Sequence, residues 1–157
     1  MKQRILAIDD EPHMLVLLER IIREKTPYNI RTTSNPLEVP ELLASERFEI
    51  IITDLKMPKF DGLEVLRLIQ QEERDELVIL ITAFGSADTA REARALGVFD
   101  YITKPFRKEE ILTCLQRGMQ VQNARSCMRD LGRLLDFEDE EKAVEEFRVM
   151  YRERKEK

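Results

Sequence analysis

The sequence predicts an α/β fold, in which a parallel β-sheet carries helices on both faces. Short, almost wholly apolar segments alternate along the chain with longer segments in which apolar residues recur at helical spacing. The apolar segments lack the polar alternation of a half-solvated sheet, which indicates strands buried on both sides. Two of them, residues 4–8 and 48–53, run directly into aspartates. Strands that alternate with helices in this way imply right-handed βαβ crossovers, and therefore a parallel sheet.

The first two strands are predicted at residues 4–8 and 28–33, the second being less buried because its polar and apolar residues alternate. The helix between them has Pro12 in its first turn, where a missing N–H has no helical partner to lose, and it ends near Lys25. The next helix contains Pro40. A proline in a helix interior removes a hydrogen bond, so this position predicts a kink or a late start.

The third strand, residues 48–53, ends at Asp54. Open α/β sheets bind ligands just beyond the carboxyl ends of their strands, so Asp54 is expected at the functional edge. After a short loop, Asp61 and Glu64 have the spacing of a capping box that begins the third helix.

The last two strands are predicted at residues 77–81 and 98–103. Between them, Ser86 can cap an alanine-rich helix that stops at Gly97. A fifth helix begins near Lys108.

Composition narrows the class of protein. A chain of 157 residues with 43% apolar and 36% charged residues suits a globular, cytoplasmic protein of one domain plus a remainder. No stretch approaches the roughly 20 apolar residues that span a membrane. A net charge of −5 argues against direct nucleic-acid binding, which calls for a basic surface. Cys114 and Cys127 are too few and too far apart for a disulfide scaffold or a metal knuckle.

Acidic residues end two of the predicted strands: Asp9 and Asp10 follow the first, and Asp54 ends the third. If these strands are neighbours, their ends lie about 5 Å apart and the three carboxylates share one pocket. Three carboxylates in one pocket require a cation. Oxygen ligands of this kind suit Mg²⁺.

A hydroxyl and an ammonium group reach the same edge, because Thr82 and Lys104 follow the fourth and fifth strands. A carboxylate beside a divalent ion can take a phosphoryl group as an acyl phosphate on Asp54, with the ion, Thr82 and Lys104 stabilising the equatorial oxygens. For any one of these aspartates alone, the alternative is that it caps a turn. The combination of residue types at four strand ends favours phosphoryl transfer.

In these features the chain resembles the receiver domain of bacterial two-component response regulators. Residues 83–90 and 97–101 look most like receivers of the nitrogen-regulation class. The segments that carry the resemblance are Asp9-Asp10, Asp54-Leu55-Lys56-Met57-Pro58, Thr82-Ala83, and Tyr101 with Lys104-Pro105. It covers roughly Lys2 to Gln120, so we expect residues 1–120 to form the receiver and residues 121–157 a helical extension.

The resemblance implies a flavodoxin-like five-stranded sheet of order 2-1-3-4-5. It also implies a signalling switch, not an enzyme beyond autophosphatase activity, that is phosphorylated on Asp54 by a sensor histidine kinase or a phosphotransfer protein. Mg²⁺ would be held by Asp10, Asp54 and the carbonyl of Lys56, with Asp9 acting largely through water. Lys56 and Phe84 would border the phosphoryl group and tune its lifetime.

Further implications of the resemblance concern the switch. The hydroxyl of Thr82 would move to the phosphoryl group while the ring of Tyr101 turns inward, and this would remodel the surface formed by the fourth helix, fifth strand and fifth helix. The Lys104-Pro105 peptide bond would be cis.

The C-terminal extension has an apolar stripe that predicts a parallel coiled-coil dimer through residues 121–135. Its consecutive a and d positions are Val121, Ala124, Met128, Leu131 and Leu135. Gly118 and Gly132 oppose the prediction, since each costs about 1 kcal/mol relative to alanine within a helix. Alternatively, the stripe folds back onto its own receiver, together with a second helix that carries Ala143, Val144, Phe147 and Met150.

The sequence leaves two alternative functions open. One is a Mg²⁺-dependent aspartyl-phosphate phosphohydrolase of the haloacid dehalogenase type, which is disfavoured because Asp9-Asp10-Glu11-Pro12 lacks the DxDx[TV] spacing. The other is a pseudo-receiver that only docks, which the intact acid, hydroxyl and lysine set disfavours. No glycine-rich ATP-binding loop follows the receiver, so we expect the output in another protein or in a longer chain of which this is a part.

Overall fold

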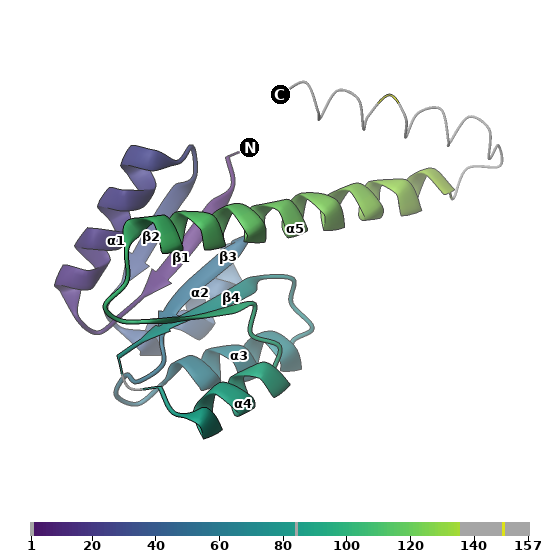
Figure 1. The fold of residues 1–157 in the computed structure, drawn as a ribbon. Helices are drawn as coiled ribbons and strands as arrows, with labels where there is room; N and C mark the ends of the chain where they lie inside the picture. The colour runs from purple at the N-terminus through teal and green to yellow at the C-terminus, as the bar shows by residue number, and fades with distance from the viewer. Residues whose placement is uncertain (1, 84, 136–148, 150–157) are drawn as a thin grey trace. The chain divides into compact units, whose positions relative to one another are not determined.

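A computed structural model describes residues 2–83, 85–135 and Val149, and it contains a five-stranded parallel sheet of order β2-β1-β3-β4-β5 (Figure 1). This is the predicted flavodoxin-like fold, which is thereby confirmed. The strands are β1 (Arg4–Ile8), β2 (Asn29–Thr33), β3 (Ile50–Asp54), β4 (Leu77–Thr82) and β5 (Asp100–Thr103).

Helices connect successive strands. They are α1 (Pro12–Lys25), a 3₁₀ turn η1 (Pro36–Glu38), α2 (Val39–Ser45), α3 (Gly62–Gln71), α4 (Ala87–Ala95) and α5 (Lys108–Leu135). The contacts between residues divide the chain into two compact units, Met1–Gly118 and Met119–Lys157. Helix α5 begins in the first unit and continues into the second. No helix in the described part of the chain is both long enough and apolar enough to cross a lipid bilayer.

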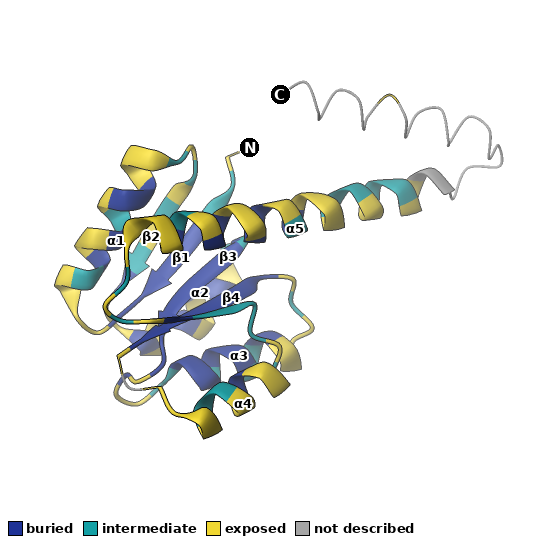
Figure 2. Ribbon diagram, viewed as in Figure 1, coloured by how far each residue is buried: buried dark blue, intermediate teal, exposed yellow. Residues whose placement is uncertain are grey.

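The three central strands β1, β3 and β4 are buried on both faces, which explains why they are almost wholly apolar, whereas the edge strands β2 and β5 are partly exposed and carry polar residues (Figure 2). On one face, residues such as Leu6, Ile51 and Leu80 form a core cluster with side chains of α2, α3 and α4. On the other, Ile50 contacts the part of α5 around Gly118. Side chains along β3 and β4 point alternately into two apolar cores, so every residue of these two strands is buried.

The helix starts follow the sequence signals. The chain makes a 3₁₀ turn at η1 before α2 starts at Val39, so Pro40 lies in the first turn, where no hydrogen bond is lost. The late start predicted from Pro40 is therefore confirmed. At α3 the capping box is also confirmed, because Glu64 N donates to Asp61 Oδ1 and Asp61 N donates to Glu64 Oε2, each at 2.9 Å.

Gly118 lies where α5 packs closely against the sheet. A Cβ atom at this position would lie 2.8 Å from Cδ1 of Ile50 and 3.4 Å from Cε1 of Phe99. The sequence suggests only that Gly118 weakens a helix. In the structure the missing side chain lets the helix backbone pack against β3.

Cys114 is buried in α5, and its Sγ donates to Asp100 Oδ2 at 3.2 Å. Burial, together with the hydrogen bond and negative charge of Asp100, raises the pKa of the thiol to about 12 from its ordinary 9.0. At pH 8 this lowers the thiolate fraction by about three orders of magnitude, and the thiolate is the form that reacts.

We predict that iodoacetamide at pH 8 labels the half-buried Cys127 in the folded protein while Cys114 stays unlabelled, as followed by peptide mass spectrometry. In urea, as a control, both should react. Equal labelling rates in the folded protein would contradict the burial of Cys114.

The predicted heptad positions all lie on α5, which is continuous to Leu135, and the side chain of Met128 is 72% exposed. Dimerisation through this stripe stays a prediction. Ala143, Val144, Phe147 and Met150, on the alternative second helix, lie outside the described residues.

Candidate functional site

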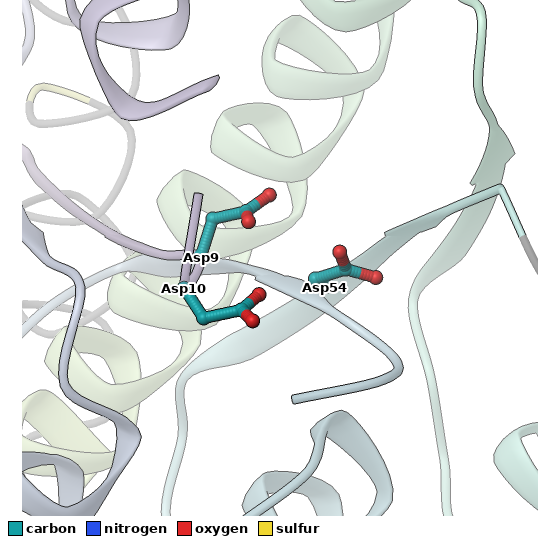
Figure 3. Close-up of side chains that lie close together, drawn as sticks. All are labelled: Asp9, Asp10 and Asp54. Carbon is teal, nitrogen blue, oxygen red and sulfur yellow. The ribbon is translucent and has the colours of Figure 1, made fainter. Parts of the chain in front are cut away.

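Three carboxylates meet at the carboxyl edge of the sheet (Figure 3). In the pairing of β1 with β3, Ile8 is opposite Thr53, so the next residues along, Asp9 and Asp54, fall side by side. Asp10 follows Asp9 in the loop, and one oxygen from each of the three carboxylates lies within 4.8 Å of the others. The pocket predicted from the strand ends is therefore present.

Lys104 bridges two of these carboxylates from a distant part of the sequence. Its Nζ donates to Asp54 Oδ2 at 3.0 Å and to Asp9 Oδ2 at 3.2 Å. The backbone fixes this position, because the N–H of Lys104 donates to the carbonyl of Thr82 at 2.9 Å. The Lys104-Pro105 peptide bond is cis, as the resemblance implies.

The ammonium and the buried carboxylate perturb each other. Burial raises the pKa of Asp9 above its ordinary value, although a hydrogen bond from the Glu11 N–H and the charge of Lys104 lower it. Burial alone would lower the pKa of Lys104, but the hydrogen bond from Lys104 to Asp54 and the charges of Asp9 and Asp54 outweigh this effect and raise it.

These directions define how the site responds to pH. The contribution of Lys104 to stability is fully present below the pKa of an unfolded lysine and is lost as pH rises through the higher folded value. Asp9 has the opposite effect on stability. Because its pKa is higher in the folded protein than in the unfolded chain, the folded state loses stability as pH rises above the pKa of an unfolded aspartate. The site thus sets three carboxyl groups against the one ammonium group of Lys104.

The other predicted site residues lie around this cluster. Thr82 ends β4, is fully buried and pairs with Thr103. Lys56 directs its N–H toward Asp54 Oδ1 at a long 3.4 Å. Tyr101 pairs with Leu80 in the sheet, and its hydroxyl lies against Gly85. The structure thus brings Asp9, Asp10, Asp54 and Lys104 into one group. Phe84 lies outside the described residues.

Gly62 supports the cluster, a role that the sequence alone did not reveal. It occupies the first turn of α3, and its N–H donates to the carbonyl of Leu55 at 2.9 Å. A Cβ here would lie 2.6 Å from the carbonyl oxygen of Asp54 and 2.7 Å from Cδ2 of Leu80. Only glycine lets α3 begin directly against the end of β3.

The sequence model of the response regulator receiver domain matches residues 5–116, which include every member of the acidic cluster and Lys104. The chain belongs to the response regulator receiver family. Receiver domains are signalling switches, and this match does not favour the dehalogenase-type phosphohydrolase.

Among known proteins, this receiver is 36% identical over 122 residues to the response regulator protein PilR of Pseudomonas aeruginosa, covering 78% of the chain and 27% of PilR. It is 31% identical over 132 residues to the regulatory protein AtoC of Escherichia coli, covering 84% of the chain and 28% of AtoC. The chain thus spans about a quarter of these two relatives. They are consistent with the predicted resemblance to the nitrogen-regulation class.

A shorter relative is matched over nearly its whole length. The receiver is 28% identical over 123 residues to sporulation initiation phosphotransferase F of Bacillus subtilis, covering 78% of the chain and 98% of that protein. Among solved structures, it superposes on the receiver domain of a LuxO repressor protein from Vibrio parahaemolyticus with a TM-score of 0.76 and 25% identity, covering 80% of the chain and 96% of that domain.

Proposed function

We propose that this receiver accepts a phosphoryl group on Asp54 from a sensor histidine kinase or a phosphotransfer protein, and that the modification controls a partner or output domain. The observation that carries the proposal is the contact of Lys104 with both Asp54 and Asp9 in a pocket of three carboxylates. An ammonium and an acidic cluster around one carboxylate suit phosphoryl transfer to that carboxylate better than they suit a purely structural role.

In the transfer, an oxygen of Asp54 forms a bond to phosphorus while the phosphorus–nitrogen bond of the donor phosphohistidine breaks, and the imidazole leaves. Asp54 itself is largely buried, with 9% of its surface exposed. Lys104 Nζ already lies 3.0 Å from Asp54 Oδ2 and can hold an equatorial oxygen of the incoming group. Thr82, at the end of the neighbouring strand, would supply a hydroxyl to another.

Mg²⁺ fits this pocket, because carboxylate oxygens are hard ligands of the kind that this ion prefers. The pocket also has three carboxyl groups and one ammonium group, that of Lys104. Asp10, Asp54 and the Lys56 carbonyl would hold the ion, with Asp9 acting through water. When bound, Mg²⁺ would neutralise charge on the transferred phosphoryl group. Burial raises the pKa of Asp9 because it disfavours the charged carboxylate, and a bound cation would stabilise that charged form.

We predict that Asp9→Asn raises the melting temperature of the metal-free protein at pH 7, since the ionised Asp9 costs stability there and an amide oxygen can still accept from the Glu11 N–H. Added Mg²⁺ should then stabilise the unaltered chain, which gains a ligand-binding term, and should stabilise Asp9→Asn less. Scanning calorimetry with and without Mg²⁺ measures both. A lower metal-free melting temperature for the variant would contradict the destabilising effect assigned to the ionised Asp9.

The switch would run from Thr82 to Tyr101 and remodel α4, β5 and α5. Support comes from the weak attachment of α4: Ala93 is the single buried side chain of this helix, and an ion pair between Arg67 and Glu92 joins it to α3. Phosphorylation adds about −1.5 to −2 charge. Shifting the ratio of active to inactive conformers from 1:99 to 99:1 takes about 5.5 kcal/mol. The contact of the phosphoryl group with Thr82 would supply part of this free energy, and its contact with Lys104 another part.

The remaining proposals concern context. The receiver would hydrolyse its own acyl phosphate at a rate tuned by Lys56 and Phe84, would act in the cytoplasm, and would itself bind neither nucleic acid nor membrane.

Residues 121–157 would form a helical extension that dimerises through residues 121–135. Sedimentation equilibrium on the full chain and on one ending at Gln120 tests this; the same oligomeric state for both would exclude the stripe as the dimerising element.

Intact-protein mass spectrometry after treatment with acetyl phosphate tests the main proposal. We expect one added phosphoryl group in the presence of Mg²⁺ and none in excess chelator. A chain that takes no phosphoryl group from a small donor or from a histidine kinase, in Mg²⁺, would be a docking pseudo-receiver instead.

A further inference from the structure

The hydroxyl of Tyr101 is buried and makes no hydrogen bond to any described residue. A buried polar group without a partner loses its bonds to water and costs free energy. The ring is nevertheless held inward, since Tyr101 packs against the core cluster that includes Ala93 of α4. Some other feature of the structure must therefore make the inward position available.

That feature is the backbone of Gly85, in the loop that joins Thr82 to α4. A Cβ at residue 85 would lie 2.0 Å from Oη of Tyr101, 2.9 Å from Cζ and 3.1 Å from Cε1. The first two distances are shorter than real Cβ contacts, and the neighbours include atoms of a ring that is attached to β5. The end of the Tyr101 side chain thus occupies the volume that the side chain of any other residue at position 85 would fill.

We infer that Gly85 is a positioning residue for Tyr101: by lacking a side chain, it leaves room for the inward ring of the tyrosine. The loop and the strand are then coupled sterically. A side chain at residue 85 excludes the inward ring, and an inward ring fixes the loop that leads from Thr82 to the weakly anchored α4. The connection of this coupling to phosphorylation rests on the proposed function, whereas the steric coupling itself does not.

A double-mutant cycle tests the steric coupling without any phosphoryl donor. Gly85→Ala is made in the natural chain, in Tyr101→Phe, which lacks the nearest atom, and in Tyr101→Ala, which lacks the ring. We expect Gly85→Ala to lower the melting temperature by about 3 to 10 °C beside tyrosine, by less beside phenylalanine, and to leave it unchanged beside alanine. As a control, Gly132→Ala, whose Cβ meets no described residue outside its own helix, should change the melting temperature by the same amount in all three backgrounds.

Equal losses from Gly85→Ala in all three backgrounds would overturn the inference, because residue 85 would then act only through the conformation of its loop. The NMR signals of ring-labelled tyrosine give a readout that loop stability does not move: in Gly85→Ala the Tyr101 signal should shift toward that of an exposed tyrosine, and an unshifted signal would also overturn it.

The link to the switch is tested by titrating both proteins with beryllofluoride and Mg²⁺. If the inward ring belongs to the phosphorylated conformer, Gly85→Ala should weaken binding several-fold, and unchanged binding would overturn this link. If the unaltered chain binds no beryllofluoride at all, the proposed phosphoacceptor function fails while the outcome of the cycle still decides the role of Gly85.

Discussion

Replacement of Asp54 by asparagine should abolish phosphorylation while leaving the fold intact. The amide cannot act as the attacking oxygen nucleophile at neutral pH, so no acyl phosphate forms. The fold should survive because the asparagine side chain is nearly the same size and its oxygen can still accept from Lys104 Nζ, which lies 3.0 Å from Asp54 Oδ2. Intact mass spectra after acetyl phosphate treatment in Mg²⁺ measure the adduct, and circular dichroism verifies folding.

Asp88→Asn is the matched control, because this carboxylate is 90% exposed in the first turn of α4 and far along the chain from the cluster. It should be phosphorylated at the unaltered rate. An Asp54→Asn protein that gained the adduct as fast as the Asp88→Asn protein would remove Asp54 from its proposed role.

Gly62→Ala should be the most damaging of the glycine substitutions. Its Cβ would meet the carbonyl oxygen of Asp54 at 2.6 Å and Cα of Leu55 at 3.0 Å, and these are backbone atoms that cannot rotate away. Overpacking of this kind costs about 3 kcal/mol, which exceeds the gain of at most about 1 kcal/mol from the better helix propensity of alanine. The clash also displaces the peptide that carries the proposed phosphoacceptor.

We therefore expect Gly62→Ala to lose about 2 to 3 kcal/mol of unfolding free energy in urea titrations, and to be phosphorylated slowly even where it is folded. Gly132→Ala serves as the control, since among the described residues nothing outside its own helix lies within 4 Å of its Cβ, and its stability should be unchanged or higher. Equal free energies of unfolding for Gly62→Ala and the unaltered chain would show that α3 is not packed as closely as described.

The location of the acidic cluster could be predicted from the sequence because it follows from local patterns. The apolar runs before Asp9 and Asp54 fix where β1 and β3 end, and parallel strands end at a common edge. Which strands are neighbours is not encoded locally, so the order 2-1-3-4-5 required the resemblance to a known family. The capping box at Asp61 and the late start caused by Pro40 were readable for the same reason as the strand ends.

Contacts between distant parts of the chain could not be read in this way. Gly62, Gly85 and Gly118 look in the sequence like a helix start, a loop residue and a weak point in a helix, yet each is close to atoms of other elements. The bridge from Lys104 to Asp9 spans 95 residues. Such close approaches depend on how elements pack, and a single sequence contains no direct record of them.

Chemical mapping can locate the phosphoryl group on the chain and so show whether Asp54 is the acceptor. The protein is treated with acetyl phosphate in Mg²⁺, the acyl phosphate is reduced with borohydride, and the modified residue is located by peptide sequencing in a mass spectrometer. We expect a single reduced aspartate, at position 54. Reduction of Asp9 or Asp10, with Asp54 unchanged, would show that Asp54 is not the acceptor.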